Sequence, residues 1–167
     1  LEVGTFESWD EIRDFINKKQ VSVVVVDNGP ETSNSKDLCR DFPNVAFRGY
    51  YVGNKSDYLH DFDELTGKVN INRNIVFDDI VVGFNEGKFK FAFDKNNKKF
   101  NDFIGQWTPM SKMAAFDNQG NPTFKWGVAE GVWDHYSHSF LYWYIATMRY
   151  REFNEVRPII KTSDEYK

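Results

Sequence analysis

A short run of β-branched residues is the feature that most limits how this chain can fold. Val21-Ser-Val-Val-Val-Val26 is almost continuously apolar and stops at the turn-forming sequence Asp27-Asn-Gly-Pro30. Such a run is typical of a strand buried on both faces, and these strands occur mainly in sheets that helices cover on both sides. We therefore expect an α/β fold in which Asp27 follows directly on a buried strand.

The residues on either side of this run predict a strand–helix–strand unit. Ser8 and Glu11 have the spacing of a capping box, and the helix that they open has its apolar positions on one face, namely Trp9, Ile12, Phe15 and Ile16. A polar helix over about 33–42 and a strand over 45–52 follow the run. Two strands joined by a helix imply a parallel pair with a right-handed crossover.

The rest of the chain predicts short elements and one long closing helix. We expect, in order, a loop over 54–67, a weak strand over 68–72, a helix over 75–85 capped by Asn74, a strand over 88–93, a helix around 100–107, two strands at 113–116 and 123–126, and a helix over 133–153. The sequence contains no repeat and no linker. With 167 residues, 41% of them hydrophobic, the chain suits a single domain over 1–167.

The composition excludes several classes of protein. An aromatic content of 17% argues against disorder, and no apolar stretch is long enough to span a bilayer or to resemble a secretion signal, so we expect a protein that is neither membrane-bound nor secreted. Cys39 is the single cysteine, which excludes an intramolecular disulfide and a Cys-x-x-Cys redox motif. Without that motif or a glycine-rich phosphate loop, a thioredoxin-like or nucleotide-binding domain is disfavoured. A net charge of −4 does not suggest a general nucleic-acid binder, but it leaves a nuclease possible, because nuclease sites contain carboxylates.

Two aspartates are the main candidates for a chemical site. Asp27 ends the buried strand and Asp134 begins the closing helix, and ligands in open α/β sheets gather beyond the carboxyl ends of strands. Two carboxylates about 4 Å apart would repel by roughly 4 kcal/mol, unless a cation such as Mg²⁺ or Mn²⁺ lies between them. His138, one turn after Asp134, could bind the metal, orient a phosphate or fill the core. The alternative is that Asp27 is a turn residue and Asp134 a helix cap, and that the two never meet.

Three segments, taken in order, resemble the C-terminal nuclease domain of the large terminase subunit of tailed bacteriophages. The first, 9–30, ends in "VVVVDNGP" and is similar to the region that carries the family's second catalytic acid. The second, "VNINRNIVFDDIVVGFNEGKFKF" at 69–91, is similar to an asparagine–arginine segment with its helix and glycine–lysine turn. The third, "WDHYSHSFLYWYIA" at 133–146, is similar to the helix that carries the third catalytic acid. Their succession covers nearly the whole chain.

The resemblance implies an RNase H-like mixed sheet flanked by helices and a metal-dependent endonuclease that cuts concatemeric double-stranded DNA during genome packaging. It implies that Asp27 and Asp134 are catalytic metal ligands, with His138 a further candidate ligand, around two Mg²⁺ or Mn²⁺ ions. Two such cations would stabilise the attacking and leaving oxygens of an in-line displacement. The implied partners are DNA, an upstream ATPase domain, the small terminase subunit and the portal. The implied location is the cytoplasm of the infected host, with transient residence at the procapsid portal.

One part of the family pattern is absent. The family's first catalytic acid lies on the first strand of a meander upstream of the Trp9 helix, whereas Leu1-Glu-Val-Gly-Thr5 is similar to the end of the third strand. We therefore expect this chain to lack the first strands and to be a fragment of a longer polypeptide. Loss of those strands should leave 21–26 with an exposed apolar edge. The packaging ATPase would be a separate, upstream domain, since no Walker-type loop is present.

The basic residues offer a weaker hypothesis about DNA. The densest basic stretch could contact phosphate, and Arg73 could either reach phosphate or pin a loop beside the site; the stretch includes Lys88, Lys90, Lys98 and Lys99. The alternative is an ordinary charged surface. Two other functions stay open: a catalytically incomplete RNase H-like interaction module, and another RNase H-like nuclease of the resolvase or integrase type.

Overall fold

The chain has an α/β fold built on a four-stranded mixed sheet. The computed structural model describes residues 4–53, 58–91, 96–117 and 119–155. The sheet has the strand order β1-β2-β4-β3, where β1 (Val24–Asp27), β2 (Ala46–Tyr51) and β4 (Lys68–Ile71) are parallel and β3 (His60–Asp63) is antiparallel to β4. A separate antiparallel hairpin joins β5 (Ser111–Phe116) to β6 (Pro122–Gly127).

Five helices complete the described part of the chain. They are α1 (Trp9–Lys19), α2 (Thr32–Asp41), α3 (Arg73–Asn85), α4 (Lys98–Trp107) and α5 (His135–Glu155). The β1–α2–β2 unit has the parallel pairing predicted from the sequence, with Asp27 opposite Gly49. None of the helices in the described ranges is both long and apolar enough to cross a membrane.

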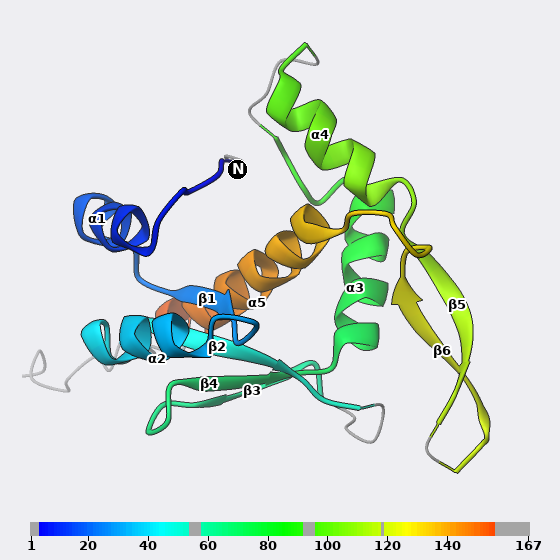
Figure 1. Cartoon of the computed structure of the whole chain (residues 1–167), viewed down its shortest axis with the longest axis horizontal. Helices are drawn as coiled ribbons and strands as arrows, with labels where there is room; N and C mark the ends of the chain where they lie inside the picture. Colours follow the sequence, from blue (N-terminus) through cyan, green and yellow to red (C-terminus); the bar gives the residue numbers. More distant parts are fainter. Residues whose placement is uncertain (1–3, 54–57, 92–95, 118, 156–167) are drawn as a thin grey trace, which may run out of the picture.

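Side-chain alternation along β1 divides the core between the two faces of the sheet. Val24 and Val26 pack against Ile16 of α1 and Leu38 of α2, whereas Val25 packs with the side chains of α3 and α5. In Figure 1, α2 lies in front of the sheet and α5 runs behind it. β1 is therefore covered on both faces, as predicted, but its valines are only half-buried, and β1 has β2 as its one strand partner among the described residues.

The α5 face of the sheet carries the larger core. Its buried members come from β2, β4 and the helices α3, α4 and α5, namely Phe47, Val69, Ile71, Val76, Phe77, Ile80, Phe103, Phe140, Leu141, Tyr142 and Ile145. Stacked and edge-on rings connect α3, α4 and α5, as in the contacts of Phe84 with Phe140 (5.4 Å between centroids) and with Trp107 (5.1 Å). Such ring pairs add to the free energy gained from burial.

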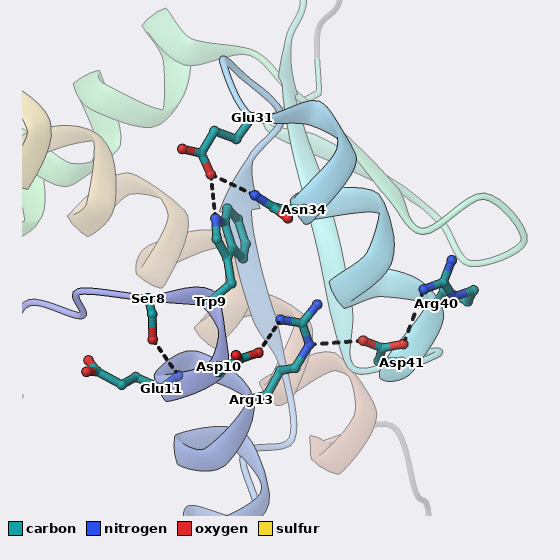
Figure 2. A network of polar contacts seen from close by, with 9 residues as sticks. All are labelled: Ser8, Trp9, Asp10, Glu11, Arg13, Glu31, Asn34, Arg40 and Asp41. Carbon is teal, nitrogen blue, oxygen red and sulfur yellow. Dashed lines mark hydrogen bonds and ion pairs between the residues drawn. The ribbon is translucent and has the colours of Figure 1, made fainter.

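Polar contacts attach α1 to α2 on the opposite face (Figure 2). The indole nitrogen of Trp9 donates to Glu31 Oε2 at 2.6 Å, and Arg13 Nε donates to Asp41 Oδ2 at 3.0 Å. Ser8 caps α1 as predicted, accepting from the Glu11 N–H at 3.2 Å. The Glu11 carboxylate, however, accepts from the N–H of Glu7 rather than that of Ser8, so half of the predicted capping box is displaced by one residue.

The predicted cap of α3 is wrong. Asn72 caps this helix, with its side chain accepting from the Ile75 N–H at 3.3 Å, and the helix begins at Arg73. The side chain of Asn74 is used elsewhere: it donates to the Phe124 carbonyl at 2.9 Å and accepts from the Trp126 N–H at 3.0 Å. Asn74 therefore fixes the β5–β6 hairpin to α3 instead of beginning the helix.

Three other predicted boundaries differ from the structure. The expected loop at 54–67 contains β3, because Phe62 points into the core against Phe47 even though its neighbours are polar. Residues 88–91 are not a strand: Phe89 and Phe91 pack inward as the alternation predicted, but they have no strand partner in the described ranges, and 92–93 lie outside them. The closing helix begins at His135, and the exposed Trp133 precedes it.

Candidate functional site

The carboxyl ends of the three parallel strands meet the beginnings of two helices. Asp27 is the last residue of β1, Tyr51 is the last residue of β2, and Ile71, which pairs with Tyr51, is followed closely by Arg73 at the start of α3. Asp27 lies two residues after Val25, so strand alternation directs its carboxylate toward the face that α5 covers. Asp134 immediately precedes α5. This is the sheet edge at which α/β proteins bind ligands.

Asp134, His138 and Tyr51 form a continuous chain of hydrogen bonds. His138 Nε2 lies 3.1 Å from Asp134 Oδ2, and His138 Nδ1 is hydrogen-bonded to the Tyr51 hydroxyl. The predicted placement of Asp134 and His138 on one helical face is confirmed. Burial lowers the pKa of His138, and the Asp134 carboxylate partly opposes this effect.

Tyr142 adds a second tyrosine to the cluster, and it is buried, whereas Tyr51 is 38% exposed. Its ring stacks on that of Tyr51, with 5.9 Å between centroids and 11° between planes. The side chain is 6% exposed, and its hydroxyl makes no hydrogen bond of good geometry within the described residues, although it lies close to the Tyr51 hydroxyl and the Asp27 carboxylate. Gly49 makes this position possible, because a Cβ at residue 49 would lie 2.6 Å from the Tyr142 ring.

Electrostatic effects indicate that the two aspartates share neighbours. Burial raises the pKa of Tyr51, the charges of Asp27 and Asp134 raise it further, and Arg73 opposes them. The guanidinium of Arg73 lies 5.5 Å from the centroid of the Tyr51 ring. Both carboxylates also act on His138. The set Asp27, Tyr51, Arg73, Asp134, His138 and Tyr142 is called the Asp27–Asp134 site below.

The donor set of this site suits a divalent cation held partly by water. Asp27 and Asp134 offer carboxylate oxygens, although Asp27 Oδ1 also accepts from the Gly29 N–H at 3.2 Å, as the alternative of a turn residue predicted. Mg²⁺ is usually bound through one or two carboxylates while it keeps several waters. Both ring nitrogens of His138 are already hydrogen-bonded, so direct metal binding by His138 would require one of these bonds to break. In the described part of the chain, no three His, Cys, Asp or Glu side chains gather closely enough to enclose a metal ion by themselves.

The lysines proposed for DNA binding lie away from the Asp27–Asp134 site, whereas Arg73 belongs to it. Lys88 and Lys90 line an open pocket with Trp143, Tyr144 and Arg151. Trp143 follows Asp134 by nine residues, about two and a half helical turns, which puts this pocket on the other side of α5. Lys88 is also paired with Glu86 at 2.5 Å. Lys98 and Lys99 are exposed in the first turn of α4.

The two tyrosines of the site were not among the residues predicted from the sequence. The rule that selected Asp27, a polar side chain at the carboxyl end of a parallel strand, applies equally to Tyr51. Tyr142 lies four residues after His138 and eight after Asp134, which is the spacing of one helical face. Both were therefore detectable from their positions in the sequence. Aromatic residues are so frequent in this chain, however, that a core position is the first interpretation for any one of them.

Comparisons of the chain with protein-family models, with curated proteins and with solved structures gave no match.

Proposed function

We propose that this chain is a metal-dependent DNA endonuclease domain of the large-terminase type, which cuts concatemeric double-stranded DNA during viral genome packaging. The observation that carries the proposal is that Asp27, at the carboxyl end of β1, and Asp134, at the start of α5, lie at the same edge of the sheet, where hydrogen bonds from Asp134 through His138 to Tyr51 connect α5 to the end of the adjacent strand β2. The order of the three resembling segments supplies the choice of the terminase family. An RNase H-like arrangement of the sheet is part of the same proposal.

Each residue of the site has a distinct task in phosphodiester hydrolysis. Asp27 and Asp134 would hold Mg²⁺ or Mn²⁺, and when bound these ions polarise the phosphate and lower the pKa of a water molecule. Arg73 carries the cationic group of the site and is suited to a phosphate oxygen, to which its planar guanidinium can donate two hydrogen bonds. His138 holds the Asp134 carboxylate by its Nε2. Two carboxylates with a single nearby arginine leave net negative charge, which favours cation binding.

The outer edge of β1 is compatible with a third acid. In the family that the chain resembles, the first catalytic acid lies on a strand beside the one that ends in Asp27. Among the described residues β1 pairs with β2 alone, so its other edge is able to accept such a strand. We propose that this strand belongs to the same longer polypeptide, together with an upstream ATPase domain. We propose in addition that the small terminase subunit and the portal are partners of this polypeptide, and that it acts in the cytoplasm of the host.

Metal binding is the first test. Mn²⁺ at about 100 times its Kd should stabilise the fold by about 2.7 kcal/mol and raise the melting temperature by about 5 to 10 °C. Asp27→Asn and Asp134→Asn should each lose most of this rise. Asp61→Asn, which changes an exposed aspartate on β3, is the matched control and should keep it. An equal rise in all four proteins would contradict a metal site at Asp27 and Asp134.

Cleavage is the second test. Plasmid DNA should be nicked or cut in the presence of Mn²⁺ or Mg²⁺, and either substitution at Asp27 or Asp134 should abolish the activity. The assay should use both the 167-residue chain and the longest native polypeptide that contains it, because the proposed first acid would be present only in the latter. Undiminished cleavage by both aspartate variants would eliminate the nuclease proposal.

A second candidate is an RNase H-like interaction module without catalysis. It is favoured by the finding that the described residues do not enclose a metal ion with three ligands of their own. This candidate requires a melting temperature that Mn²⁺ leaves unchanged in the longest native polypeptide. A resolvase- or integrase-type nuclease would share the metal dependence, and it would prefer branched or end-processed DNA to linear concatemers.

A further inference from the structure

We propose that Tyr51 is a positioning residue that fixes the Asp134 carboxylate through His138. The inference rests on the proposed function where it concerns metal binding, but its hydrogen-bonding part stands independently. Tyr51 comes from the end of β2 and Asp134 from the start of α5, so the chain of three side chains connects the sheet to the closing helix. In this arrangement His138 lies behind the carboxylate rather than binding the metal.

The hydrogen-bonding capacities of the three groups define one neutral arrangement. An ionised carboxylate can only accept, so His138 must carry its proton on Nε2 to donate to Asp134 Oδ2. Nδ1 of the neutral ring is then an acceptor, and the Tyr51 hydroxyl is the donor that satisfies it.

Tyr51 has contacts in the site besides the one to His138. Its ring stacks on that of Tyr142, and the guanidinium of Arg73 lies 5.5 Å from its centroid. The His138 ring also meets Phe77 edge-on, at 5.7 Å between centroids. The direction of Nδ1, and hence of the whole imidazole, is therefore set by the end of β2.

As a consequence, the two carboxylate oxygens of Asp134 have different roles. Oδ2 is hydrogen-bonded to His138, while no hydrogen bond within the described ranges uses Oδ1. Oδ1 is therefore left for a cation, in a direction that the bond to Oδ2 fixes. Partners of this kind behind a metal ligand commonly change metal affinity or activity by about 10- to 100-fold when they are removed.

The hydrogen-bonding part is tested by the imidazole nitrogen resonances of the metal-free protein. The chain has three histidines, so all the signals can be assigned. We expect His138 to be neutral with its proton on Nε2 in the native protein. In Tyr51→Phe, which keeps the ring and its stacking, the His138 Nδ1 resonance should move and the second tautomer should become populated. Tyr150→Phe, an exposed change on α5, should leave it unchanged, and exposed His135 is the internal reference.

The metal part is tested by Mn²⁺ titration of the same proteins. Tyr51→Phe should weaken Mn²⁺ binding by about 10- to 100-fold, and Tyr150→Phe should bind like the native protein. His138→Gln, whose amide can still donate to Asp134, should bind Mn²⁺ more tightly than His138→Ala, which cannot. A merely structural role for His138 would not rank the two in this way once both are shown to be folded.

Two results would overturn the proposal. One is a His138 resonance that is identical in the native protein and Tyr51→Phe. The other is equal Mn²⁺ affinity in these two proteins when the native protein does bind the ion. If the native protein binds no Mn²⁺, the proposed function fails instead, and the nitrogen resonances still decide whether Tyr51 holds His138 and Asp134.

Discussion

Among the described residues, the α5 face of the sheet contains eleven buried apolar side chains, five of them aromatic, whereas the α1–α2 face contains three, namely Ile16, Leu38 and Ala46. The α1–α2 face is supplemented by exposed polar contacts such as those of Trp9 and Arg13 (Figure 2). Buried aromatic side chains stabilise far more than exposed ion pairs do. The comparison indicates that the α5 face provides most of the folding free energy.

The same face also holds the polar cluster. His138 and Tyr142 of the Asp27–Asp134 site point from α5 into the edge of the aromatic core, where Phe77 contacts His138. A site supported by a dense core is held within a narrow range of geometries, because packed side chains have few alternative positions. The α1–α2 face has no comparable requirement, so substitutions there should have smaller effects on both stability and the site.

The largest contrast is expected between a buried phenylalanine of the α5 face and an exposed phenylalanine of α1. Phe77→Ala empties a fully buried position on the α5 face and should lower the free energy of unfolding by about 3–5 kcal/mol. Phe15→Ala removes a side chain of α1 that is 40% exposed and should cost about 1 kcal/mol or less. Urea unfolding of the two variants measures both values. Equal losses would refute the assignment of stability to the α5 face.

A smaller contrast is expected between two glycines. Gly49→Ala would force a methyl group to 2.6 Å from the Tyr142 ring and 3.3 Å from Ile71 Cδ1, and such overpacking costs about 1–3 kcal/mol. Gly105→Ala in α4 meets nothing within 4 Å and should stabilise by up to about 1 kcal/mol through helix propensity. The melting temperature should therefore fall in Gly49→Ala and rise in Gly105→Ala. A Gly49→Ala protein as stable as the native one would show that Tyr142 is free to move.

High pH should weaken the α5 face through Tyr144, which is partly buried. Burial, followed by the hydrogen bond to Asp79, raises the pKa of Tyr144 to about 12, so the folded state retains a proton that the unfolded chain releases near pH 10. Stability should therefore be unaffected below about pH 10 and fall as the pH rises from there toward 12. Urea unfolding at pH 9 and pH 11 should show a smaller fall in Tyr144→Phe than in the native protein. Tyr58→Phe changes an exposed residue, so its stability should fall between pH 9 and pH 11 as much as that of the native protein.

The smallest effect is expected at the ion pair between α1 and α2. Arg13→Gln removes the contact with Asp41, in which the two side chains are 24% and 37% exposed, and should cost less than about 1 kcal/mol. The loss should shrink further in about 1 M salt, where the screening length falls to about 3 Å. Unfolding in low and high salt measures the difference. A loss of the size expected for Phe77→Ala would show that the polar contacts, rather than apolar burial, hold this face together.

Much of the fold was predictable because it depends on local patterns. The β-branched run at 21–26, the Ser8 cap and the helical spacing of Trp9, Ile12 and Ile16 each specify a neighbouring element without long-range information. Phe15, predicted on the same apolar face, is instead 40% exposed and contacts Phe6. β3 was missed, because a single inward-facing phenylalanine in an acidic segment leaves no clear alternation. The wrong cap of α3 has a similar cause: Asn72 and Asn74 are both able to cap, and the choice depends on a hairpin fifty residues away.

The site was predictable in part. Asp27 and Asp134 were predicted because they lie at the end of a strand and at the start of a helix. His138 was predicted because it follows Asp134 by one helical turn, and the two are in contact. The hydrogen bond from Tyr51 to His138 joins residues 87 positions apart, and no local pattern encodes such a pairing. The lysines proposed for DNA binding were chosen because basic residues are dense in that part of the sequence. Such density does not indicate on which side of α5 a lysine lies. Whether any of them contacts DNA stays a prediction.

The attachment of the β5–β6 hairpin to α3 has a consequence for the Asp27–Asp134 site. Asn74 and Asp78, one turn apart, bind the hairpin through the main chain of Phe124 and Trp126 and through the Trp126 indole. Asn74 is adjacent in sequence to Arg73, so the hydrogen bonds that hold the hairpin lie at the same end of α3 as the guanidinium beside Tyr51. The position of Arg73 in the site therefore depends on the helix end to which the hairpin is attached.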